Sequence, residues 1–165
     1  MTGRSTPLPI SSPPEPQSEL WQTLADEAAA ESPLWAEALL PDGERDRSPI
    51  FSTLAPERFA LALETIYEGY LLHYGRPRLF AHPGDEEAIL LGDYLYAHGL
   101  VRVAATGELD AVATFADLIS TCAHLQAEGS AGDDEAWLAA ARRLGGDATA
   151  AAVSAACLAH ARRFG

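Results

Sequence analysis

Apolar residues recur at helical spacing through most of this chain. Phe59, Leu63, Ile66 and Tyr70 follow one another at intervals of four, three and four residues, so they share one face of an α-helix. Similar intervals return in the segments that follow. A half-buried strand would alternate apolar and polar residues, and no segment of the sequence has that pattern. The spacing therefore predicts an all-α fold.

Prolines, glycines and aspartates interrupt the helical pattern and mark the expected helix ends. Pro77 disfavours a helical conformation at Arg76, Gly107 suits the position just beyond a helix C-terminus, and Asp85 and Asp147 suit N-caps. We expect helices near residues 19–31, 33–40, 56–74, 86–106, 109–127, 133–144 and 147–163. The last five are the main helices of one bundle. The two long ones should be antiparallel neighbours, because the link between them is very short.

The sequence divides into three regions. Residues 1–17 contain five prolines and several serines; proline fixes φ and removes a hydrogen-bond donor, so we expect a disordered tail there. Residues 18–48 should form two short helices and a charged loop that lie against the rest. Residues 49–165 should form the helical bundle. The whole chain of 165 residues is long enough for one domain of ordinary size.

The charge balance argues against several partners. The net charge is −13, from 24 acidic residues and 11 arginines, and there is no lysine. Such a surface repels phosphate backbones and anionic lipids, so we expect no nucleic-acid or membrane-surface binding. No apolar run reaches the ~18–20 residues of a membrane span, and the N-terminus lacks the apolar region of a secretory signal. Cys122 and Cys157 have no disulfide-framework spacing, which favours free thiols and a cytoplasmic location.

Three sequence segments occur in the same order and at similar spacing as three segments of a known protein family. Residues 64–73 read ETIYEGYLLH, residues 90–97 read LLGDYLYA, and residues 118–129 end in Glu-Gly. Together they resemble helices from the N-terminal half of trans-polyprenyl diphosphate synthases, with a likeness that covers about residues 54–164. The resemblance implies a truncated isoprenoid synthase fold, in which the helix that contains the second segment and the helix after it form a dimer interface.

The family's metal-binding residues are missing from this chain. Its first aspartate cluster binds Mg²⁺ and an allylic diphosphate, whereas the matching positions here are Tyr74, Gly75 and residues 76–78, which read Arg-Pro-Arg. These groups cannot replace carboxylate oxygens around Mg²⁺. Without the metal, nothing neutralises the charge that develops on a diphosphate leaving group. We therefore expect no prenyl transfer by this chain, no catalytic residues and no cofactor.

Two groups of residues are candidates for contact with other molecules. The resemblance makes residues 86–127 the candidate interface, where small residues allow close helix approach. The interface candidates are Gly92, Tyr96, Gly99, Val103, Val112, Phe115, Ile119 and Cys122. Aromatic side chains from two neighbouring helices either line an apolar pocket or form a core with satisfied hydroxyls. The pocket candidates are Tyr67, Tyr70, His73, Tyr74 and Tyr96.

Other polar residues favour structural roles. His73 lies near a helix end and should interact with free carbonyls there. Asp93, if buried in mid-helix, needs a partner, which we expect to be an arginine or a helix end. A zinc site would require four side chains to converge, namely Cys122, His124, Cys157 and His160. The first two are two residues apart and point away from each other on a helix, so we expect no metal site.

The leading hypothesis is a non-catalytic accessory or scaffold protein. It would act through helix-mediated association, as a homodimer or as a heteromer with a prenyl synthase subunit. The alternative is a binding module for an isoprenoid or another apolar small molecule. A third hypothesis is an enzyme with non-metal chemistry that uses Glu64, His73 and Asp93, and it requires these three to converge on a cleft.

Overall fold

The computed structural model describes residues 16–81 and 84–164, and within these ranges the chain is helical and has no β-strand. The helices are α1 (Pro16–Glu31), α2 (Pro33–Ala38), α3 (Ala60–Tyr74), α4 (Asp85–Ala104), α5 (Leu109–Glu128), α6 (Asp133–Arg143) and α7 (Ala150–Ala161). Short 3₁₀ turns span Asp42–Glu44, Ser52–Leu54 and Glu57–Phe59. The predicted all-α fold is confirmed. Among the described helices, none combines the length and the apolar character that crossing a membrane requires.

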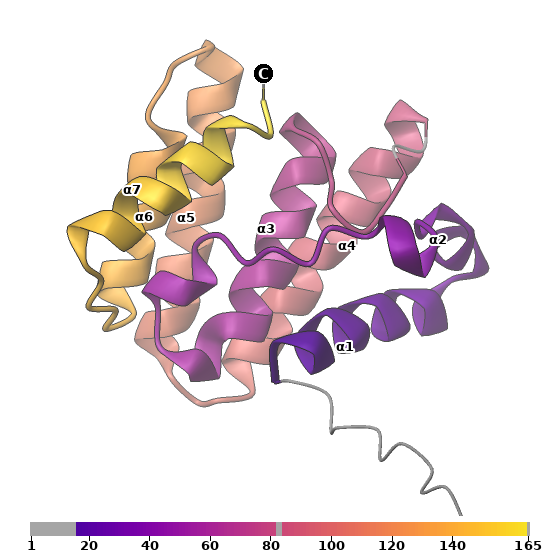
Figure 1. Ribbon diagram of the computed structural model, residues 1–165, viewed down its shortest axis with the longest axis horizontal. Coiled ribbons are helices and arrows are strands. Elements are labelled where there is room, and N and C mark those ends of the chain that lie inside the picture. Colours follow the sequence, from indigo (N-terminus) through magenta and orange to yellow (C-terminus); the bar gives the residue numbers. More distant parts are fainter. Residues whose placement is uncertain (1–15, 82–83, 165) are drawn as a thin grey trace, which may run out of the picture.

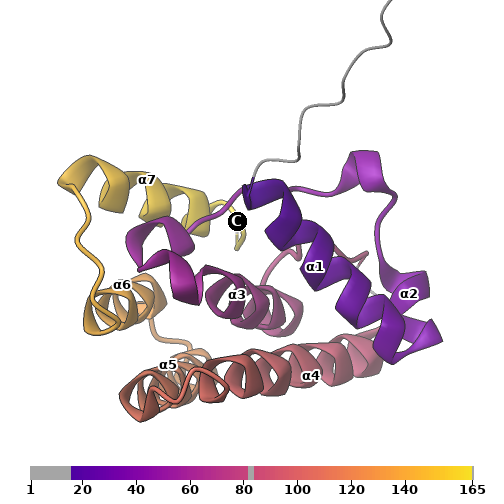
Figure 2. The ribbon, with the colours of Figure 1, turned by 90° about the horizontal axis from the view of Figure 1, so that it is seen from below.

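Helix α3 forms the centre of the molecule (Figure 1). Residues 62–72 are all buried, although the spacing predicted a single apolar face. In Figure 2, α4 and α5 cover one side of α3, while α1 and α7 lie on the opposite side. A helix that is covered on both sides must bury polar positions as well, and Glu64, Thr65 and Glu68 are buried in this way.

Two apolar clusters form the core. The larger joins α3 to α5, α6 and α7, and Phe51, Phe115 and Trp137 are among its bulkiest members. The smaller joins α1 to α3 and α4, with Trp21 and Leu72 in contact with its other members. Helix α1 therefore shares a core with the bundle.

The predicted helix stops agree with the structure. Gly75 follows the last residue of α3, and Gly107 and Gly129 take positive φ values of 77° and 63° after α4 and α5. The predicted N-terminal tail overlaps a helix by two residues, because α1 begins at Pro16. The rest of that tail, residues 1–15, lies outside the described residues.

Two predicted N-caps are wrong by one or two residues. Asp85 is the first residue of α4, and Gly84 occupies the N-cap position. Thr149 caps α7 in place of Asp147, since its hydroxyl accepts a hydrogen bond from the amide of Ala152 at 3.2 Å. Aspartate and threonine are both good N-caps, so the sequence alone could not choose between them.

Helix α4 packs chiefly against α3. Helices α4 and α5 are neighbours, as predicted, but they diverge from the turn at residues 105–108 that joins them (Figure 1). A short link fixes where two helices meet, whereas their side chains decide which faces pack. The close partner of α4 is therefore the preceding helix.

Candidate functional site

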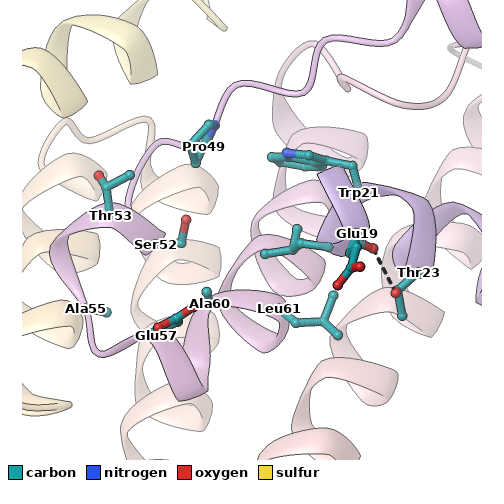
Figure 3. Close-up of a pocket in the computed structure, with 11 residues that line it drawn as sticks. Glu19, Trp21, Thr23, Pro49, Ser52, Thr53, Ala55, Glu57, Ala60 and Leu61 are labelled. Atoms are coloured by element: carbon teal, nitrogen blue, oxygen red, sulfur yellow. Dashed lines mark hydrogen bonds between the residues drawn. The ribbon is translucent and has the colours of Figure 1, made fainter. Parts of the chain in front are cut away.

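An open cleft of about 470 Å³ lies between the N-terminal half of α1 and residues 49–61. Figure 3 shows Trp21 of α1 across from Pro49. Among the described residues of its lining, the ionisable ones are Glu19 and Glu57, and none is a histidine, cysteine or arginine. The described lining therefore combines an apolar wall with two carboxylates and the hydroxyl groups of Thr23, Ser52 and Thr53.

A buried ionic cluster ties α3 to the segment that follows it. The Arg78 guanidinium lies 2.6 Å from Glu64 Oε2 and 2.9 Å from Glu68 Oε2, and all three side chains are fully buried. Glu68 also accepts the backbone N–H groups of Arg78 and Leu79, at 2.7 and 2.8 Å. Glu64 accepts the N–H of Ile50 at 3.3 Å. The two carboxylates thus hold two loop segments against one helix.

The remaining contacts of Arg78 complete this cluster. Its guanidinium donates to the carbonyl oxygen of Ser48 at 3.1 Å and lies over the rings of Trp21 and Tyr67, at 4.6 and 4.9 Å from their centroids. Burial alone would lower the pKa of Arg78, but the two carboxylates outweigh it and raise the pKa above its usual value. The charges of the cluster are paired, and none of its three ionic side chains lies in the lining of a described cavity, which favours a structural role.

A second polar network joins α3 to α5, α6 and α7. The Tyr67 hydroxyl lies 2.8 Å from His160 Nδ1, and His160 Nε2 lies 2.9 Å from Asp133 Oδ2. The Tyr70 hydroxyl donates to the same carboxylate oxygen at 2.5 Å and accepts from Gln126 Nε2 at 2.7 Å. Asp133 is the first residue of α6, where the helix dipole favours negative charge.

This tyrosine–histidine–aspartate network is closed to solvent at its tyrosine end. Burial tends to raise the pKa of Asp133, but the hydrogen bond from Tyr70 and the charge of His160 lower it overall. Burial, and then Asp133, raise the pKa of Tyr70. Tyr67, Tyr70 and His160 are at most 3% exposed, and none of the network residues lines a described cavity. The arrangement therefore cross-links α3, α5, α6 and α7.

The residues of the predicted apolar pocket lie in one aromatic cluster. Tyr67 and Tyr70 are core residues with bonded hydroxyls. The ring of His73 stacks on Tyr96 with centroids 5.1 Å apart, and Tyr74 lies 5.2 Å from Tyr70. The described cavities are lined by other residues. Of the two roles considered, Tyr67 and Tyr70 take the core role, whereas His73 and Tyr96 are half-buried and Tyr74 is 37% exposed.

The predicted interface residues are buried or half-buried within the single chain, and their contact with a second chain stays a prediction. Gly92, Gly99, Val103, Phe115 and Cys122 are buried, and Tyr96, Val112 and Ile119 are half-buried. The glycines do permit close helix approach, but the approaching helix is α3. A Cβ on Gly92 would lie 3.1 Å from the carbonyl oxygen of Gly69, and one on Gly99 would collide with Ile66.

Asp93 is exposed, so it does not need the partner that a buried carboxylate would require. Its side chain is 65% exposed, and its Oδ1 lies 3.2 Å from His73 Nε2. That nitrogen has no hydrogen-bond partner among the described residues, so the contact is close in distance but poorly aligned. Glu64 belongs to the Arg78 cluster instead. The three residues of the enzyme hypothesis therefore do not converge.

The cysteine and histidine candidates for zinc do not form a common site. Within the described ranges, no group of three or more histidine, cysteine, aspartate or glutamate side chains is placed to hold a metal ion. Cys122 is buried, and burial, with a smaller effect from Asp133, raises its pKa to about 12. His160 belongs to the tyrosine–histidine–aspartate network.

Exposed apolar residues lie along α4 and at the first residue of α5, and most of them fall between the exposed Asp93 and Asp110. Leu90, Val101 and Leu109 are 59%, 67% and 79% exposed. From residue 94 to residue 109, every exposed residue is uncharged: Ala97, Val101, Ala104, Ala105, Thr106, Gly107 and Leu109. We call these seven residues, with Leu90, the α4–α5 outer surface.

The charged residues of that stretch are paired inside the chain. Arg102 pairs with Glu27 of α1, and Glu108 lies 2.9 Å from Arg58. His98 contacts the same Glu27 carboxylate at 2.9 Å. Internal pairing therefore keeps these charges from dominating the α4–α5 outer surface.

The sequence analysis does not identify two structural residues. These are Arg78, which pairs with two buried carboxylates, and His160, which bonds to Tyr67 and Asp133. A signal for Arg78 exists, because Glu64 and Glu68 are four residues apart on an otherwise apolar helix and need a cation when buried. For His160 no comparable signal exists. Its partners come from α3 and α6, and only the packing of α7 brings them together.

Comparison of the chain with protein-family models, with curated proteins and with solved structures gave no significant match in any of the three.

Proposed function

We propose that this chain is a non-catalytic helical association module that pairs with a second copy of itself through the α4–α5 outer surface. The observation that supports this proposal is a run of exposed residues without charge, from 94 to 109, in a chain of net charge −13. Contiguous exposed apolar patches commonly mark protein contact sites. Here the patch includes side chains that are up to 79% exposed.

Charge favours a second copy as the occupant. Two acidic chains repel each other wherever their charged faces meet. Two such chains can approach through an uncharged surface, because their carboxylates then lie outside the contact. The surface also combines protruding side chains, Val101 and Leu109, with small ones, Ala97 and Ala104. Two copies related by a two-fold axis can therefore place the large side chains of one beside the alanines of the other.

The interior supports a non-catalytic role. The carboxylates of Glu64 and Glu68 are occupied by Arg78, and His160 is bonded on both ring nitrogens. Neither group lines a described cavity. The polyprenyl diphosphate synthase relationship, and a synthase subunit as a partner, rest on the sequence resemblance alone. Such a subunit would compete for the same surface.

Sedimentation velocity over a range of protein concentrations tests the proposal. We expect a monomer–dimer equilibrium for the wild type, and at least about tenfold weaker dimerisation for Val101→Ser, which corresponds to about 1.4 kcal/mol. Leu158→Ser is the matched control, because Leu158 is an apolar residue on α7 that is 57% exposed. A wild type that stays monomeric up to ~1 mM, or an equal effect of both substitutions, would contradict the proposal.

A further inference from the structure

A cleft at the C-terminal end of α7 gathers positive charge in an otherwise acidic molecule. Its volume is about 470 Å³, and its lining includes Arg76, Arg162, Arg163 and Asp46. The arginines come from two segments that are 86 residues apart in the chain. Three of the 11 basic residues of the sequence thus converge on one depression.

Internal contacts fix two of these arginines. Arg163 pairs with Asp46, and the guanidinium of Arg76 donates to the carbonyl oxygen of Arg162. The backbone N–H of Arg76 also donates to the carbonyl oxygen of Arg163 at 3.0 Å. Arg162 is exposed, and its guanidinium has no bonding partner within the described ranges. The cleft is therefore preformed and retains one uncommitted cation.

The cleft keeps a surplus of positive charge. Three guanidinium groups against one carboxylate leave about two charges in its lining. The C-terminal end of α7 opposes them with about half a negative charge, and Arg76 offsets part of that through its bond to the Arg162 carbonyl. Burial tends to raise the pKa of Asp46, but hydrogen bonds from Ser48 and Arg163 lower it overall, so this carboxylate remains ionised at neutral pH.

We propose that this cleft binds a small phosphate-bearing anion, preferably a phosphate monoester. Guanidinium groups bind phosphate oxygens in bidentate fashion, and the surplus of about two charges suits a dianion. The apolar part of the lining, Ile50, Pro77 and Ala159, favours an ester with an apolar substituent over inorganic phosphate. A polyanion such as nucleic acid would meet the repulsion of a chain of net charge −13, whereas a small dianion can enter locally.

Isothermal titration calorimetry with inorganic phosphate and with phenyl phosphate tests this site. We expect Arg162→Gln to weaken the binding of both by about tenfold, as for the loss of one charge-assisted hydrogen bond, and phenyl phosphate to bind more tightly than phosphate. Arg142→Gln is the matched control, since Arg142 is an exposed arginine on α6 that is not in the lining of this cleft. It should change the affinity by less than about twofold.

If Arg162→Gln and Arg142→Gln weakened anion binding equally, the proposal would be overturned, because the anion would then respond only to the net charge of the chain. Heat absent from the wild type at ~10 mM phenyl phosphate would overturn it as well. Unchanged thermal melting of both variants establishes that they are folded. In Figure 2, α7 and the α4–α5 layer lie on opposite sides of α3, so this result and the dimerisation result can fail independently.

Discussion

Arg78 joins three segments of the chain at a single point. Its guanidinium contacts both carboxylates of α3, its backbone N–H is bonded to Glu68, and it donates to the carbonyl oxygen of Ser48. A buried charge cluster is not itself strong evidence of high stability, since desolvation opposes its formation. Removing one partner is costly, however, because the other charges stay buried without compensation.

We predict that Arg78→Met lowers the free energy of unfolding by about 3–5 kcal/mol, because Glu64 and Glu68 are left as buried carboxylates. Denaturant-induced unfolding measures this loss. Arg143→Met is the control, since Arg143 is 54% exposed and pairs with an exposed Asp117; it should change stability by at most about 0.5 kcal/mol. A loss below about 1 kcal/mol for Arg78→Met would show that the cluster does not hold these segments.

Asp133 makes the second network sensitive to acid. Its pKa is lowered in the folded state, so its contribution to stability is fully present above the unfolded pKa and is lost as the pH falls through the folded pKa. We predict that the free energy of unfolding of the wild type falls more steeply between about pH 5 and pH 2 than that of Asp133→Asn.

Unfolding curves recorded at a series of pH values check this difference in slope. Asp117→Asn, at a side chain that is 64% exposed, should leave the slope close to that of the wild type. Parallel pH profiles for the wild type and Asp133→Asn would mean that the hydrogen bonds to Tyr70 and His160 do not stabilise the ionised carboxylate.

At the residue scale, the sequence predicts that charged side chains are buried better than it predicts which residues they contact. The presence of acidic residues on an apolar helix indicates a buried charge, but the Arg-Pro-Arg run of residues 76–78 contains two arginines and nothing local distinguishes Arg78 from Arg76. Arg78 is fully buried, whereas Arg76 is exposed and bonds to the end of α7. Only the path of the loop after α3 separates their roles.

At the scale of elements, the glycines of α4 determine how closely it approaches α3. Each glycine costs roughly 0.5–1 kcal/mol of helix propensity relative to alanine. A Cβ on Gly92 would come within 2.6 Å of His73 Nε2. The same substitution at Gly99 would push a methyl group into Ile66. Close packing of the two helices compensates for the weak propensity.

We predict that Gly99→Ala destabilises the protein by about 1–3 kcal/mol, since overpacking outweighs the gain in helix propensity. In an Ile66→Ala background the added methyl group has room, so the same substitution should be neutral or stabilising there. Thermal or denaturant unfolding of the wild type, the two single variants and the double variant gives the coupling energy between Gly99 and Ile66. Stabilisation by Gly99→Ala in the wild-type background would be incompatible with close α3–α4 contact at this position.

Helix boundaries were largely predictable from the sequence, and helix partners were not. Proline and glycine act within a few residues, so the stops at Gly75, Gly107 and Gly129 are confirmed. The glycines of α4 do mark a site of close helix approach, as predicted, but the helix that approaches them is α3 of the same chain. Sequence periodicity shows that a face is covered and does not identify the helix that covers it.

At the scale of the whole molecule, net charge opposes self-association. Two chains of −13 each repel through solvent, and salt screens this repulsion, with a Debye length that falls from about 30 Å at 0.01 M to about 10 Å at 0.1 M. The exposed positions of the proposed contact from residue 94 to residue 109 are uncharged, so the contact between two copies does not depend on intermolecular ion pairs.

We therefore predict that dimerisation strengthens as ionic strength rises from about 0.01 M to 0.1 M. Sedimentation velocity in a series of sodium chloride concentrations gives the dissociation constant at each. Weaker association at higher salt would point to an interface held by ion pairs, and thus to a different surface of the chain.

The most direct test of self-association is an isotope-filtered nuclear Overhauser experiment on a dimer that mixes labelled and unlabelled chains. We predict intermolecular signals between methyl groups of Leu90, Val101 and Leu109, together with the alanine methyls of the α4–α5 outer surface. Intermolecular signals confined to other surfaces, or none from a sample that sediments as a dimer, would contradict the account.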